Sequence, residues 1–339
     1  MKTIELGATD EHVSRISLGA MGMGTEADDP ASFALLDRFL ADGGTFIDTA
    51  DCYAWWGAQS TKGGQSEELL GRWFARSGAR DQVFLSTKGS ARLTDPAEVW
   101  PAGQEFPDWD LARQRYVGTG ARVLRKSLEG SLRRLGTDRI DRIDLYYVHV
   151  DDTSTPLEET LQTLAGFVAE GKVRYLGWSN VRTWRLERIR QLCAKNGWPA
   201  PVAIQQQHTY LQRKPGLRNA SIVDDEQLDY LEAHPDLTLV AYSPLLKGLY
   251  DAPKGEREKI WIYEPYAGEA AQARLAAVTR IAEEVGALPS QVVLAWLMAQ
   301  KSPAIIPLIG TTKVSRYEQA ATALDLSLSD EQLAELESA

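Results

Sequence analysis

The segment Thr45-Phe46-Ile47-Asp48-Thr49-Ala50-Asp51-Cys52-Tyr53 begins as a short apolar run, ends in polar residues and leads into an amphipathic helical pattern. This unit recurs along the whole chain. The apolar runs predict strands at Arg15–Leu18, Thr45–Asp48, Val83–Thr87, Ile143–His149, Tyr175–Ser179, Val202–Gln206, Leu237–Tyr242 and Ala304–Leu308. Runs this apolar are typical of strands that are buried on both faces, as in a parallel sheet.

Helical patterns lie between these strands and after the last one. They cover Ser32–Ala41, Ser66–Arg76, Ala121–Leu135, Leu157–Glu170, Thr183–Lys195, Asp225–Ala233, Ala271–Gln300 and Val314–Ala323. Pro289-Ser290 predicts that the longest pattern is two helices, because proline is favoured in the first turn of a helix. Eight alternations of a strand with a helical pattern predict a closed α/β barrel, the (β/α)8 TIM barrel. We expect it to form one domain over residues 1–339.

Three further features add to the barrel. Thr3–Leu6 and Glu11–Val13 flank a Gly-Ala-Thr-Asp turn and predict an N-terminal β-hairpin. Two connections, Ser90–Gly118 and Ser243–Glu269, are longer than simple joints and are rich in tryptophan and tyrosine. Both follow the carboxyl ends of strands, where barrel active sites are built, so we expect these long loops to line the functional site.

Composition narrows the class of partner and compartment. The net charge is −10 and no basic stripe stands out, which argues against a nucleic-acid partner. Cys52 and Cys193 are the only cysteines and form no motif, which argues against a disulfide framework and fits a reducing cytosol. The N-terminus has no apolar signal core and no 18-residue stretch is apolar, so we expect a cytoplasmic protein without a membrane segment, either monomer or homo-oligomer.

Titratable residues gather where three neighbouring strands are predicted to end. Asp48 ends the second strand, Lys88 follows the third, His149 ends the fourth, and Tyr53 lies five residues after Asp48. One such residue could be a solvated rim charge, but four of these types at one rim favour catalysis. Cys52, beside Tyr53, is a candidate thiol nucleophile, yet no base lies near it in the sequence, which argues against that role.

This set, in this order and strand placement, resembles the aldo-keto reductase family, and the likeness extends over essentially the whole chain. The resemblance implies that a hydride passes from a nicotinamide to a carbonyl carbon while Tyr53 protonates the oxygen. A free phenol has a pKa near ~10, so we expect the Lys88 ammonium to lower the pKa of Tyr53, with Asp48 keeping Lys88 charged. His149 either orients the carbonyl or relays a proton, and the sequence leaves both roles open.

The resemblance also implies a cofactor site on the later strands. Ser179, Asn180 and Gln205 would hold the carboxamide of the nicotinamide, although Ser179 and Asn180 could also simply cap the next helix. Tyr242 would stack on the ring or else be a core tyrosine. Ser243 and Leu245, at the end of the seventh strand, are further cofactor-binding candidates. The following Leu246-Lys247-Gly248-Leu249 resembles the loop over the pyrophosphate, with Lys247 as its charge partner.

The last strand leads into a candidate phosphate site. Backbone amides at a helix start and two basic side chains favour NADP(H) over NAD(H), and they belong to Gly310, Thr311, Thr312, Lys313 and Arg316. The chain departs from the family at two places. It has Gln319-Ala320 where Glu-Asn is frequent, so adenine contacts must differ, and it has His208 where a tyrosine is usual. No glycine-rich Rossmann turn follows the first strand.

The pocket is expected to have aromatic walls. Trp55 and Trp56 follow Tyr53 closely and Trp109 lies in the first long loop, so we expect them to bind a bulky, sugar-like or polycyclic substrate. No His, Asp or Glu set has metal-ligand spacing, so we predict no metal. Two other functions remain open: a cofactor-binding regulatory subunit with little turnover, and a lyase or isomerase that uses Lys88 as a Schiff base.

Overall fold

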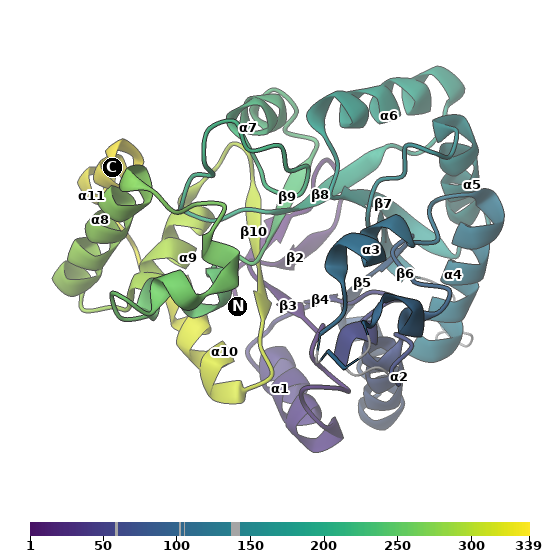
Figure 1. The fold of residues 1–339 in the computed structure, drawn as a ribbon, viewed down its shortest axis with the longest axis horizontal. Coiled ribbons are helices and arrows are strands. Elements are labelled where there is room, and N and C mark those ends of the chain that lie inside the picture. The colour runs from purple at the N-terminus through teal and green to yellow at the C-terminus, as the bar shows by residue number, and fades with distance from the viewer. Residues whose placement is uncertain (58–59, 102, 105, 137–142) are drawn as a thin grey trace.

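The computed structural model describes residues 1–339 except 58–59, 102, 105 and 137–142. Its parallel strands close into a barrel in the order β10-β3-β4-β5-β6-β7-β8-β9, which confirms the predicted TIM barrel (Figure 1). The strands are β3 (Ser17–Gly19), β4 (Phe46–Asp48), β5 (Phe84–Gly89), β6 (Ile143–Val148), β7 (Val173–Ser179), β8 (Pro201–Gln207), β9 (Thr238–Tyr242) and β10 (Ile305–Gly310).

Helices surround the barrel and cover its outer face (Figure 1). They are α1 (Asp29–Ala41), α2 (Gln65–Ser77), α3 (Trp109–Gln114), α4 (Ala121–Leu135), α5 (Leu157–Ala169), α6 (Thr183–Asn196), α7 (Asp225–Glu232), α8 (Glu269–Val285), α9 (Pro289–Ala299), α10 (Val314–Ala321) and α11 (Asp330–Ser338). The predicted break at Pro289 is confirmed. The start of α1 is earlier than predicted, because Asp28 caps it by accepting a hydrogen bond from the Ala31 backbone N–H.

The N-terminal hairpin closes the floor of the barrel. It pairs β1 (Thr3–Glu5) with β2 (His12–Ser14) in antiparallel register. Leu6 and Val13 are fully buried and belong to the cluster that fills the barrel interior, together with Phe46, Phe84, Leu145, Tyr147, Ala203, Val240, Ile306 and Leu308. The end of the barrel next to the hairpin is therefore apolar.

Along β4 and β5, the side chains that face the barrel interior change from apolar to charged. On β5, Phe84, Ser86 and Lys88 lie at alternate positions and so share one face, which is the face that carries Phe84 into the interior cluster. On β4, Phe46 and Asp48 repeat this order from apolar to charged. These two strands thus place polar side chains at the carboxyl-terminal rim, above the apolar interior of the barrel.

Candidate active site

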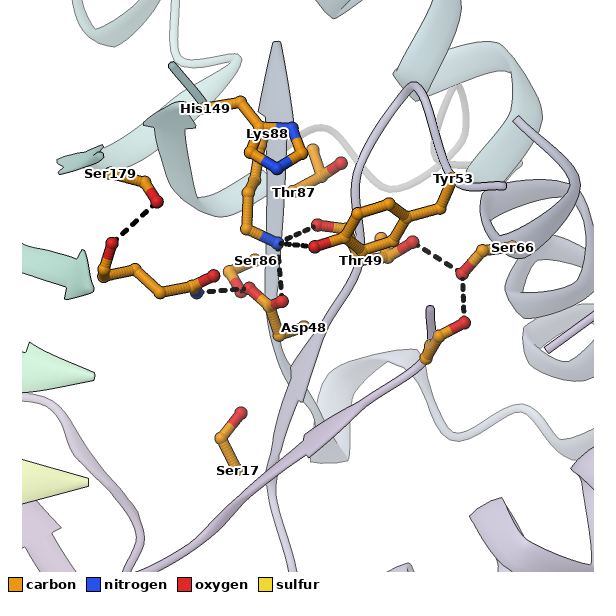
Figure 2. Close-up of polar contacts among 12 residues, drawn as sticks. Ser17, Asp48, Thr49, Tyr53, Ser66, Ser86, Thr87, Lys88, His149 and Ser179 are labelled. Atoms are coloured by element: carbon orange, nitrogen blue, oxygen red, sulfur yellow. Dashed lines mark hydrogen bonds and ion pairs between the residues drawn. The ribbon is translucent and has the colours of Figure 1, made fainter. Parts of the chain in front are cut away.

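Lys88 is the centre of the polar cluster at this rim. Its Nζ atom donates to Asp48 Oδ2 at 2.6 Å, to the Thr49 backbone oxygen at 2.8 Å and to the Tyr53 hydroxyl at 3.0 Å. Figure 2 shows these three contacts converging on the ammonium group. Lys88 has no exposed surface and Asp48 is only 2% exposed, so the ion pair is shielded from water.

Asp48 is fixed by donors on both of its oxygens. While Oδ2 accepts from Lys88, Oδ1 accepts from Ser86 Oγ at 2.6 Å and from Gln205 Nε2 at 2.9 Å. Ser86 was not among the predicted site residues, although its position two residues before Lys88 on one strand signals the same face. Gln205, which is predicted to bind the carboxamide, thus also uses one of its amide hydrogens to hold Asp48.

The electrostatics of this cluster differ from the sequence prediction. Burial raises the pKa of Tyr53 to about 12; Lys88 acts to lower it, but less strongly. Burial acts to lower the pKa of Lys88, but Asp48 and Tyr53 outweigh it and hold that pKa above its ordinary value. At neutral pH the cluster therefore contains a charged ammonium group and a protonated phenol, which is the form that can donate a proton.

His149 lies immediately after β6, and its backbone N–H extends the strand ladder by donating to the Gly89 oxygen at 2.8 Å. Its ring meets the Tyr53 ring edge to face, with centroids 5.6 Å apart. Burial, reinforced by the nearby Lys88 charge, lowers the pKa of His149 well below its ordinary value, so the imidazole is neutral. Its Nδ1 atom lies 3.4 Å from Cys52 Sγ, a contact between residues 97 positions apart that sequence reasoning missed.

The predicted carboxamide-binding residues form a connected group beside this cluster. Asn180 Nδ2 donates to the His149 backbone oxygen at 2.7 Å and to Ser179 Oγ at 3.0 Å. The Tyr242 hydroxyl donates to Asn180 Oδ1 at 2.9 Å, and Ser179 Oγ donates to the Gln205 backbone oxygen at 2.6 Å. These hydrogen bonds link β7, β8 and β9 to His149, which directly follows β6.

The segment after β9 has an unusual backbone. Ser243, Leu246 and Lys247 all have positive φ angles, of 51°, 45° and 57°. The Lys247 Nζ atom lies 5.1 Å above the ring of Trp261, which is 70% exposed. Leu245 is partly buried against the hydrophobic core. Lys247 is predicted to face the pyrophosphate of the cofactor. In the structure, its ammonium group lies over the exposed indole ring of Trp261.

A second candidate anion site lies at the start of α10. Lys313 occupies the N-cap position without a side-chain hydrogen bond to the helix, and Lys313 and Arg316 are exposed. Neither forms an ion pair with any residue that the structure describes. Thr311 and Thr312 are partly exposed and Gly310 is exposed at the end of β10. Gln319 contacts Asp251 at 3.3 Å and so links α10 to the segment that carries Lys247.

Three tryptophans form an aromatic wall beside Tyr53. The ring centroids of Trp55, Trp56 and Trp109 lie 5.2 to 5.8 Å apart, and Trp56 also packs edge-on against Tyr53 at 5.8 Å. Trp109 is 42% exposed, whereas Trp55 is 2% exposed. Of the three predicted substrate contacts, Trp55 thus has almost no exposed surface, and it packs on the rings of both Trp56 and Trp109.

The first long loop that carries Trp109 is tied at its base. Leu93 and Tyr116 form an antiparallel bridge, and the backbone N–H of Gly118 donates to the Ser90 oxygen at 3.1 Å. Arg92 donates to the Asp51 backbone oxygen at 2.8 Å and joins the loop to the segment before Tyr53. In the second loop, by contrast, Tyr263 and Tyr266 are buried core residues rather than part of the mouth.

Within the described part of the chain, no group of three or more His, Cys, Asp or Glu is arranged to hold a metal ion. No single described helix is both long enough and apolar enough to span a membrane. The helices α8 and α9 reach that length and apolar character only when they are counted together, as a bent pair.

Comparison with known proteins gives a consistent answer. Residues 15–339 match the model of the Aldo/keto reductase family. An uncharacterized oxidoreductase YrpG of Bacillus subtilis is 31% identical over 98% of this chain and 93% of its own length. The aryl-alcohol dehydrogenase [NADP(+)] of Phanerodontia chrysosporium is 32% identical, over 95% of this chain and 81% of its own. The norsolorinic acid reductase stcV of Emericella nidulans is also 32% identical, over 96% and 78%.

A solved structure agrees with these relatives. The crystal structure of the thermostable aldo-keto reductase Tm1743 with the inhibitor epalrestat superimposes with a TM-score of 0.72 at 28% sequence identity, covering 100% of this chain and 99% of that one. The closed barrel, the polar cluster at its rim and the match of nearly the whole chain lead to one conclusion: this chain belongs to the aldo/keto reductase family of oxidoreductases.

Proposed function

We propose that this protein is an NADPH-dependent reductase of aldehydes or ketones in which Tyr53 protonates the carbonyl oxygen. The observation that carries the proposal is the single ammonium group of Lys88, bonded to the Tyr53 hydroxyl at 3.0 Å and to Asp48 at 2.6 Å. A phenol that gives up its proton becomes an anion, and a fixed ammonium group stabilises that anion. Asp48, held by Ser86 and Gln205, keeps the ammonium group in place.

In the proposed reaction, the cofactor, Tyr53 and His149 have separate roles. NADPH, when bound, supplies the hydride to the carbonyl carbon. Tyr53 donates from its hydroxyl, which its raised pKa keeps protonated at neutral pH. His149, neutral and partly exposed, orients the carbonyl oxygen toward Tyr53 by a hydrogen bond.

Several residues fit the parts of NADPH. The free helix start of α10 with Lys313 and Arg316 suits a phosphate on the ribose, because N–H groups and basic side chains both favour negative charge. Gly310, Thr311 and Thr312 add backbone and hydroxyl donors. The group Ser179, Asn180 and Tyr242 suits the nicotinamide end, and the relative from Phanerodontia whose name includes NADP(+) supports this choice over NADH.

The substrate class follows from the aromatic wall. Trp56 and Trp109 present indole surface next to the proton donor, which suits a flat or ring-shaped substrate. Relatives named for an aryl alcohol and for norsolorinic acid support an aromatic or polycyclic carbonyl compound.

Lys88 is poorly suited to the alternative chemistry of a Schiff base. An amine must lose its proton to attack a carbonyl, yet Lys88 is buried, donates to three acceptors and has a raised pKa. A regulatory subunit would bind NADPH without turnover, so activity separates it from a reductase.

The test is Tyr53→Phe, assayed for NADPH oxidation with a panel of aromatic and polycyclic aldehydes and ketones and for NADPH binding by titration calorimetry. We expect turnover to fall by roughly 10²–10⁴-fold, the usual contribution of a general acid, while NADPH affinity stays within about twofold. Tyr230→Phe on α7, remote from the rim, is the control. Normal turnover in Tyr53→Phe refutes the assignment, and wild-type NADPH binding without turnover on any compound favours the regulatory subunit.

A further inference from the structure

Cys52 contacts the imidazole of His149 from the residue just before Tyr53. Its Sγ atom lies 3.4 Å from His149 Nδ1, and the cysteine is 2% exposed. Among the described residues this is the one side-chain hydrogen-bond partner of the ring. The backbone of His149 is fixed separately, by Gly89 and Asn180. The backbone of His149 is thus held by the neighbouring strands, whereas Nδ1 of its ring contacts the thiol.

We propose that the Cys52 thiol donates its proton to Nδ1 of His149 and thereby keeps the imidazole hydrogen on Nε2, the nitrogen available to a carbonyl oxygen. Cys52 is then a positioning residue that selects the histidine tautomer. This inference deepens the proposed carbonyl reduction and rests on it for its catalytic consequence. Figure 2 shows one ring nitrogen of His149 turned toward the Lys88 and Tyr53 side of the site.

The direction of the hydrogen bond follows from the chemistry of the two partners. Burial, and then the neighbouring Asp51 charge, raises the pKa of Cys52 well above its ordinary value, so the sulfur carries a hydrogen. The imidazole is neutral and has one N–H and one bare nitrogen. A bare imidazole nitrogen is a strong acceptor and a thiol sulfur is a weak one, so S–H to Nδ1 is the better pairing. The reverse pairing uses the weak acceptor and leaves the S–H unpaired.

The selected tautomer has a consequence at the reacting oxygen. With hydrogen on Nε2, His149 donates to the carbonyl oxygen and holds it beside the Tyr53 hydroxyl. With hydrogen on Nδ1, the ring would present a lone pair to an oxygen that also carries lone pairs. The two tautomers therefore differ in whether the substrate is attracted or repelled at the point where Tyr53 must deliver its proton.

The test combines a spectroscopic and a kinetic measurement on Cys52→Ala and Cys52→Ser. Protein labelled with ¹⁵N-histidine reports which ring nitrogen carries hydrogen through long-range ¹H–¹⁵N correlations. The chain has 4 histidines, and the His149 signals are assigned by their loss in His149→Gln. Cys193→Ala removes the other buried cysteine, on α6, and serves as the matched control.

We expect wild type, Cys193→Ala and Cys52→Ser to show hydrogen on Nε2, because a hydroxyl also donates to Nδ1. Cys52→Ala should show a mixture of tautomers and a kcat roughly three- to tenfold lower, the range of one ordinary hydrogen bond, with NADPH affinity unchanged. Cys52→Ser should recover most of that loss.

Hydrogen on Nδ1 in the wild type overturns the proposal without any variant, and so does Cys52→Ala with an unchanged Nε2 tautomer. The spectroscopic result is independent of turnover. A tautomer change in Cys52→Ala in a protein that reduces no carbonyl compound supports the inference about Cys52 while the proposed function fails.

Discussion

Lys88→Met removes the ammonium group while it keeps much of the side-chain volume. The Nζ atom lies 3.0 Å from the Tyr53 oxygen. With an effective dielectric constant of about 20, a full phenolate charge at that distance is stabilised by about 5.5 kcal/mol, and a half-developed charge by about 2.8 kcal/mol. Since each 1.36 kcal/mol is a factor of ten in rate, we expect kcat to fall by roughly 10²- to 10⁴-fold.

Stability must be separated from catalysis in this experiment. Lys88→Met leaves the Asp48 carboxylate buried without its counter-charge, and breaking a buried ion pair costs about 3–5 kcal/mol. The double variant Asp48→Asn/Lys88→Met removes both charges and keeps a side-chain oxygen for Ser86 and Gln205. We expect the double variant to regain most of the lost thermal stability and none of the lost activity.

The assays are NADPH oxidation at saturating carbonyl substrate, NADPH titration and thermal melting, with the exposed Lys126→Met on α4 as the control. NADPH affinity should stay within about threefold, because none of the Lys88 contacts belongs to the candidate cofactor site. A Lys88→Met protein that is folded and retains more than about a tenth of wild-type kcat would refute the electrostatic role, since even half a charge predicts a larger loss.

Three further predictions follow from the rim and its surroundings. With the pKa of Tyr53 near 12, carbonyl reduction should be flat in pH from 6 to 9, whereas alcohol oxidation, which needs the phenolate, should rise steadily over that range; a plateau in oxidation near pH 8 contradicts this value. Lys313→Ala/Arg316→Ala should weaken NADPH binding by about 10–100-fold and leave NADH binding within about twofold, in titrations of both cofactors; equal losses would show that these residues do not bind the ribose phosphate. Burial, and then the charge of Glu67, raises the pKa of Asp51 to about 7 in the folded state. In the unfolded state the pKa of Asp51 is its ordinary value near ~4. Between these two pH values only the folded state holds the proton, so the free energy of unfolding falls as the pH rises. Asp51→Asn should therefore raise the melting temperature more at pH 8 than at pH 5, and an equal effect at both pH values would disprove this linkage.

The strands of the fold were the part most open to prediction, because each is a buried apolar run between helices. The boundaries of β6, β7, β8 and β9 differ from prediction by at most two residues. Periodicity alone did not reveal α3, whose six residues at Trp109–Gln114 are too few to show a helical face within a polar loop.

The site was predictable where side-chain position follows strand register and unpredictable where it depends on loop packing. Asp48, Lys88 and His149 lie at or next to strand ends, so their convergence follows from the barrel. Trp55 is buried and Cys52 reaches His149 because of the path of the loop after β4, which no local pattern specifies. The raised pKa of Tyr53 was missed for the same reason: charge can be read from sequence, whereas the depth of burial cannot.

The tied base of the Ser90–Gly118 loop has a consequence for which parts of the site a change in that loop can reach. The Leu93–Tyr116 bridge and the bond from Gly118 to Ser90 bring the two ends of the loop together before they enter the barrel, so β5 and α4 do not depend on what lies between. Within the loop, Trp109 packs on Trp55 and Trp56 and so reaches the site, whereas Lys88 lies on β5, before the tied base. We therefore expect changes in this loop to alter the surface beside the aromatic wall before they alter the cluster around Lys88.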